Sequence, residues 1–107
     1  MKESVLQKKV IDEISERLPE AIVIKNDANY LQGYPDLSVH YNGMFALLET
    51  KQHEDSSKRP NQEYYINKTN NEGGFARFIN QENKDVILDE MERSFKTRRI
   101  TRISKSK

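Results

Sequence analysis

Three charged residues stand at the ends of two short apolar segments, and their types suit phosphate chemistry. The stretch "GYPDLSVHYNGMFALLETK" places Asp36 directly after a proline, and it places Glu49 and Lys51 behind the apolar run "MFALLE". Carboxylate oxygens are the ligands that Mg²⁺ prefers, and a lysine ammonium can stabilise negative charge or hold a water. If the fold brings the three side chains together, they point to metal-dependent hydrolysis of a phosphodiester.

The turn between the two segments decides whether the carboxylates meet. The dipeptide "NG" at residues 42–43 tolerates the positive φ angles that a two-residue hairpin turn requires. Such a turn pairs Tyr41 with Met44, and the same register places Asp36 opposite Glu49. Directly opposed residues share one face of the sheet and have Cβ atoms about 4.5–5.5 Å apart. The sequence therefore predicts that the two carboxylates are neighbours.

Two carboxylates this close repel, and each raises the pKa of the other. Lys51 follows Glu49 by two residues, so on a strand it points to the same face. One explanation is a divalent cation between the acids. The other is an ordinary sheet surface on which Lys51 offsets the two acids as an ion pair. Geometry predicted from the sequence leaves both explanations open.

Hydrophobic periodicity predicts the elements that would position these residues. Leu6, Val10, Ile14 and Leu18 recur at helical spacing, and Pro60 suits the first turn of a second helix. We predict helices over residues 3–18, 60–72 and 85–95, and strands over residues 21–25, 36–41, 44–50 and 75–79. This order predicts a small α/β or α+β domain with a mixed sheet.

Length and composition limit the function classes. A chain of 107 residues suits one domain, which we place at residues 1–95 with a tail at 96–107. The absence of cysteine excludes disulfides and thiolate metal sites. No apolar run is long enough for a membrane helix or a signal core, so we expect a soluble cytoplasmic protein. We also expect no small-molecule cofactor. A homodimer is expected, because a domain this small buries little surface.

The charge distribution is uneven although the net charge is only +1. From residue 93 onward the chain carries seven lysine and arginine residues and no acid, so the rest of the chain is acidic. A basic tail on an acidic body indicates a polyanion partner such as DNA. A solvated, disordered terminus is the alternative.

The motifs together resemble a known family. "GYPD" followed by "LLETK" resembles the PD-(D/E)xK nuclease signature, and "ESVLQKKVIDEI", with Glu3 and Gln7, resembles the first helix of the small phage and bacterial VRR-NUC enzymes. "RPNQ", which contains Gln62, and "EGGFARFI" also resemble that family. The resemblance spans residues 3–79. It implies a restriction-endonuclease-like αβββαβ core and activity like that of a Holliday junction resolvase.

The resemblance also implies a set of metal ligands. Asp36 and Glu49 would bind Mg²⁺ or Mn²⁺ with the help of the backbone carbonyl of Thr50. Glu3 would reach in from the first helix as a further ligand of the metal or of a water.

The remaining roles implied by the resemblance concern the reaction itself. Lys51 would activate the water or stabilise charge on the phosphate, and Gln62 would orient either the lysine or the scissile phosphate. Because Glu3 lies near a chain end, Glu13 or Glu16 on the same helix could take its place.

The function implied is a metal-dependent endodeoxyribonuclease, structure-specific for branched or junction DNA and phage-related. Two alternatives remain, a non-catalytic nucleic-acid-binding module on the same fold and a regulatory or inhibitor protein that binds a host protein. Acidic residues in the loop after the lysine, Glu54 and Asp55, would repel a DNA backbone unless a metal or the pair Lys58 and Arg59 compensates. The residues expected to contact DNA are Lys58, Arg59, Arg98, Arg99 and Arg102.

Overall fold

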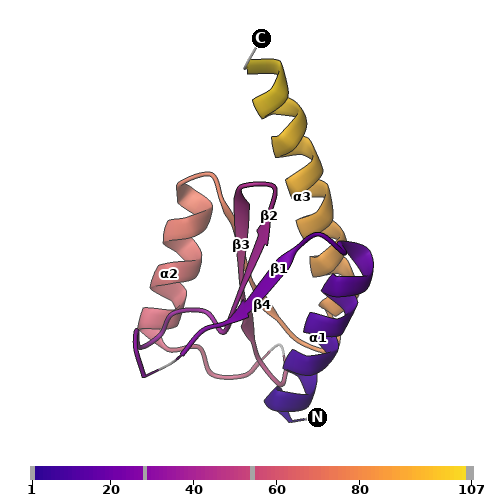
Figure 1. Cartoon of the computed structure of the whole chain (residues 1–107). Coiled ribbons are helices and arrows are strands. Elements are labelled where there is room, and N and C mark those ends of the chain that lie inside the picture. The colour runs from indigo at the N-terminus through magenta and orange to yellow at the C-terminus, as the bar shows by residue number, and fades with distance from the viewer. Residues whose placement is uncertain (1, 28, 54, 106–107) are drawn as a thin grey trace.

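The computed structural model describes residues 2–27, 29–53 and 55–105, with the side chains of residues 99–105 left out. The elements are α1 (Glu3–Arg17), β1 (Ile22–Lys25), β2 (Leu37–Tyr41), β3 (Met44–Thr50), α2 (Pro60–Asn71), β4 (Phe75–Ile79) and α3 (Lys84–Lys105). The sheet lies between α2 on one face and α1 with α3 on the other (Figure 1). This is the predicted α+β order with a mixed sheet. Within the described ranges no helix is long and apolar enough to cross a membrane.

The sheet has the strand order β1-β2-β3-β4. The first three strands run antiparallel, and β4 pairs in parallel with β3 after the crossover through α2. Asn42 and Gly43 have φ angles of 52° and 79°, so they form the expected hairpin turn between β2 and β3. Tyr41 pairs with Met44, which confirms the predicted register.

The main core lies between the sheet and the helices α1 and α3. Leu6, Val10 and Ile14 of α1 are almost completely buried, as are Met91 and Phe95 of α3. On the other face α2 contributes a smaller cluster. It consists of Leu47, Ile66 and Ala76, with Tyr34 and Phe78 packed against it. The α1–α3 side therefore supplies most of the buried apolar surface, and the α2 side leaves room at the sheet for polar groups.

The last helix is longer than its apolar pattern predicts. We expected it over residues 85–95, because the buried stripe ends at Phe95. The structure instead continues α3 to Lys105, past the edge of the sheet (Figure 1). The segment after Phe95 contains neither glycine nor proline, so nothing in it interrupts the backbone hydrogen bonds. Residues 96–105 of the expected tail are therefore helical.

Candidate active site

The hairpin register brings the two predicted carboxylates together where β2 begins and β3 ends. Leu37 pairs with Leu48, so Asp36, one residue earlier, stands opposite Glu49. The backbone N–H of Asp36 donates to Glu49 Oε1 at 3.2 Å. The N–H of Thr50 donates to Asp36 Oδ2 at 3.0 Å. Each carboxylate is thus held by the backbone of the neighbouring strand.

A buried hydroxyl orients the Asp36 carboxylate. Thr50 has no exposed surface, and its Oγ1 donates to Asp36 Oδ2 at 2.6 Å. The same Oγ1 accepts a hydrogen bond from Gln7 Nε2 at 3.1 Å. Because both donors of Thr50 converge on Oδ2, they fix the rotation of the carboxylate group. The chain Gln7–Thr50–Asp36 also ties α1 to the site.

A second chain of hydrogen bonds runs from the lysine to the other carboxylate. Lys51 Nζ donates to Gln62 Oε1 at 2.9 Å, and Gln62 Nε2 donates to Glu49 Oε2 at 2.9 Å. Gln62 Oε1 also accepts from the backbone N–H of Arg59 at 3.1 Å, just before α2 begins at Pro60. Gln62 therefore joins the start of α2 to the end of β3. The contact with Lys51 is the one that the family resemblance implies, and the contacts with Glu49 and Arg59 were not predicted.

One glycine allows the loop before Asp36 to approach α2. Gly33 has a φ angle of 85°, a conformation that costs glycine little and other residues much more. A Cβ atom at this position would lie 2.5 Å from the side chain of Asn61 in the first turn of α2. Gly33 therefore sets the separation between the loop that carries Asp36 and the helix that carries Gln62.

Burial perturbs the pKa of Glu49. Its side chain is buried, with 4% of the residue exposed. Desolvation is the main reason that the pKa of Glu49 rises from 4.5 to about 7, and the charge of Asp36 adds to it. Lys51 and the N–H of Asp36 oppose this rise, and Glu3 adds to it slightly. The ionised form thus lacks charge compensation, which a divalent cation would supply. Two opposed carboxylates are also the ligand set that Mg²⁺ commonly uses, so these residues fit such an ion.

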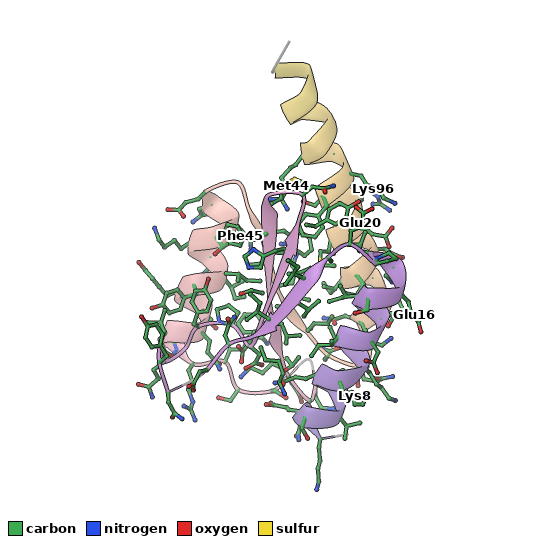
Figure 2. The ribbon with its side chains drawn as sticks, viewed as in Figure 1. Lys8, Glu16, Glu20, Met44, Phe45 and Lys96 are labelled. Carbon is green, nitrogen blue, oxygen red and sulfur yellow. The ribbon has the colours of Figure 1, made fainter. Side chains whose placement is uncertain are left out.

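The acidic residues of the first helix differ in how near they lie to the site. Glu3 is exposed at the start of α1 and is close enough to raise the pKa of Glu49. Across residues 2–27, 29–53 and 55–105, however, no three histidine or acidic side chains form a cluster that could hold a metal. Glu13 instead forms ion pairs with Arg17 and Lys84. Glu16 is exposed on the outer side of α1 (Figure 2).

The residues expected to contact DNA fall into two separate groups. Lys58 and Arg59 directly precede α2, beside the carboxylates, and Lys58 Nζ lies 5.4 Å from the centre of the Phe78 ring. Arg98 belongs to α3 and lies at the other end of the sheet, near Gly43 and Gly74. The side chains of Arg99 and Arg102, and all of Glu54, lie outside the described residues. Asp55 is exposed.

Sequence reasoning missed the role of the Thr50 side chain, because it assigned a function only to the backbone carbonyl. Strand alternation puts Thr50 on the core face with Leu48 and Ala46. A polar side chain on a core face must find a hydrogen-bond partner. A polar threonine at a core-facing position of the strand was therefore the signal from which the role of this side chain could have been predicted.

Removing the hydroxyl of Thr50 tests its structural role. Thr50→Val keeps the shape but leaves the Asp36 carboxylate and the Gln7 amide without this partner. We expect it to lower the free energy of unfolding by about 1–3 kcal/mol, measured by urea denaturation in EDTA. Thr50→Ser keeps the hydroxyl and is the matched control. A valine variant as stable as the wild type would show that the hydrogen bonds contribute nothing to the fold.

The raised pKa of Glu49 predicts a pH effect on the metal-free protein. Between pH 4.5 and about 7 the folded state binds more protons than the unfolded state, so stability falls as the pH rises through that window. Glu49→Gln cannot ionise. In EDTA we therefore expect its melting temperature, relative to that of the wild type, to rise from pH 5 to pH 8. Parallel pH profiles of the two proteins would contradict the shift.

Comparisons with known proteins support the fold. The sequence matches no protein-family model and no curated protein. A solved "VRR_NUC domain" structure superposes with a TM-score of 0.69 at 22% identity, covering 81% of this chain and 94% of the other. A "VRR_NUC domain protein" gives 0.67 at 16% identity, covering 90% of this chain and 89% of the other. The chain therefore has the fold of VRR_NUC domains, as its motifs predict.

Proposed function

We propose that the protein is a metal-dependent endodeoxyribonuclease. The observation that carries the proposal is the single hydrogen-bonded cluster of Asp36, Glu49, Lys51 and Gln62 at the end of the β2–β3 hairpin. An isolated ion pair on a sheet surface would not need a buried acid with a pKa near 7. The VRR_NUC fold supports a nuclease in particular.

Asp36 and Glu49 would hold Mg²⁺ or Mn²⁺, with the Thr50 carbonyl and Glu3 as further proposed ligands. When bound, the ion would act as a Lewis acid on the phosphate and lower the pKa of a water. Lys51 would hold that water or stabilise negative charge on the phosphate. Its ammonium group is already oriented by Gln62, so little order remains to be gained when DNA binds.

We propose that two chains act together on branched or junction DNA, in a phage-related setting. A single chain offers one cluster for one strand, so cutting both strands requires two copies. At the outer edge of the sheet, β1 exposes Ile22 and Ile24 by 64% and 45%. Phe45, 43% exposed, lies on β3, where it pairs with His40 of β2, the residue that also pairs with Ile22 (Figure 2 labels Phe45). The edge of β4, by contrast, is covered by Asn70, whose side chain bonds the N–H and C=O of Ala76.

The open β1 edge suits antiparallel pairing with the β1 strand of a second copy. In that arrangement Ile22 of each chain would lie beside Ile24 of the other. DNA contacts are assigned to two groups of basic residues, one beside the cluster and one on α3. These residues are Lys58, Arg59, Arg98, Arg99 and Arg102.

The nuclease proposal predicts loss of metal-dependent cutting in cluster variants. The wild type should cut branched, nicked, linear or supercoiled DNA with Mg²⁺ or Mn²⁺ and not with EDTA. Glu49→Gln and Lys51→Gln should each lower the rate at least about 100-fold. Glu20→Gln and Lys96→Gln, which alter exposed residues elsewhere, are the matched controls. A wild type that binds DNA but cuts none of these substrates would favour a non-catalytic binding module. Cluster variants that cut normally would refute the assigned site.

The dimer proposal predicts that charge at the β1 edge separates the chains. Ile24→Lys should lower the molar mass measured by light scattering from that of a dimer to that of a monomer, because lysines would face apolar side chains across the interface. Val5→Lys is the matched control, since Val5 on α1 is also 45% exposed. A monomeric wild type, or a dimeric Ile24→Lys variant, would contradict the proposed interface.

A further inference from the structure

An arginine-lined cleft lies away from the carboxylate cluster, between β4 and α3. It is open to solvent and has a volume of about 390 Å³. Arg77 enters it from β4, and Arg93 and Arg98 enter it from α3. Ser94 contributes a hydroxyl group to the lining of the cleft, and Glu90 contributes a carboxylate. Among the residues whose side chains are described, three guanidinium groups and one carboxylate surround this open space, so the site favours anions.

Arg77 is held in place before any ligand arrives. Its Nη1 donates to Asn70 Oδ1 and to the carbonyl oxygen of Ala76, both at 2.9 Å. The centre of its guanidinium group lies 4.2 Å from the centroid of the Phe75 ring. Stacking and hydrogen bonds fix the planar fork of an arginine, so less conformational entropy is lost when it binds a ligand.

The two arginines of α3 come from neighbouring turns of one helix. Arg98 lies over the Phe95 ring at 5.2 Å, and its Nε donates to the carbonyl oxygen of Ser94 at 3.4 Å. Arg93 is exposed. Because Phe95 is completely buried, the core fixes the part of α3 that carries both side chains. The positions of all three arginines are thus set by buried aromatic residues or by packed secondary structure.

We propose that this cleft binds the phosphate backbone of a DNA segment, as a second contact separate from the carboxylate cluster. Guanidinium groups bind phosphate oxygens in pairs, and an open cleft suits an extended strand better than an enclosed small molecule. The basic sequence of α3 continues beyond the cleft, which extends the same electrostatic surface. That the ligand is DNA rests on the proposed nuclease function.

The location of the cleft determines what it would do. Phe75 at the cleft pairs with Ala46, and Ile79 pairs with Thr50 beside the carboxylates. The two sites are therefore separated by four residues of β4, about 13 Å along the strand. A phosphate bound at the cleft belongs to a part of the DNA other than the bond that is cut. The cleft would hold a flanking duplex or a second arm of a branched substrate.

Metal-free binding tests this contact without any need for cleavage. Fluorescence anisotropy of a labelled branched DNA in EDTA, over a series of salt concentrations, gives both affinity and salt dependence. We expect Arg93→Gln to weaken binding several-fold, and Arg77→Gln/Arg93→Gln by about 10-fold or more. The slope of log K against log salt should become shallower by about 0.9 for each phosphate that the variant no longer neutralises.

Lys96→Gln is the matched control because it removes one positive charge from the same helix. Lys96 forms an ion pair with Glu92 at 3.0 Å, so its loss should leave both affinity and slope unchanged. Arg93→Gln alters an exposed residue, so its result does not depend on a folding defect.

The proposal is wrong if both arginine variants bind DNA with wild-type affinity and slope. It is also wrong if Lys96→Gln weakens binding equally, because total charge would then explain the effect. The binding experiment is done in EDTA and does not depend on cleavage. If the wild type failed to cut DNA in the separate assay with Mg²⁺ or Mn²⁺, the nuclease function would be refuted, but the measured effect of the arginine variants on DNA binding would still stand.

Discussion

The register of the β2–β3 hairpin is the constraint on which the site depends. The turn at Asn42 and Gly43 lies at the far end of the hairpin from the carboxylates, yet it determines which residues face each other there. A slip of one residue would place Asp36 opposite Leu48 or Thr50 and would send alternate side chains to the wrong face. The chemistry at one end of the hairpin is thus specified by backbone conformation at the other.

Two glutamines from different helices stabilise an arrangement that is otherwise unfavourable. Gln7 reaches Asp36 through Thr50, and Gln62 contacts Glu49 directly. These bonds satisfy buried oxygen atoms, but they do not offset the burial of Glu49 and its repulsion by Asp36, which together raise the pKa of Glu49. The fold therefore retains local instability at this point, a pattern typical of functional sites rather than of structural ion pairs.

The parts of the fold that can be predicted from the sequence are those determined by residues close to one another along the chain. The "NG" turn, the alternation of β2 and the proline before Gln62 are local signals, and each leads to the observed element. The hydroxyl of Thr50 and the position of Arg77 depend on contacts with α1 and α2, which no local pattern contains. The length of α3 was underestimated for another reason. A helix ends where its backbone hydrogen bonds end, and an apolar stripe shows only where packing ends.

The extension of α3 beyond the sheet has a thermodynamic consequence. An isolated helix of about ten residues is only marginally stable in water, so the segment after Phe95 inherits its helicity from the turns that the core holds. The spacing of the basic residues on that segment is then coupled to the packing of one buried aromatic ring. Loosening the core around Phe95 would unfold this end of α3, and the regular spacing of its charges would be lost before the whole domain unfolds. Such a change would alter how the protein holds a polyanion without altering the identity of any basic residue.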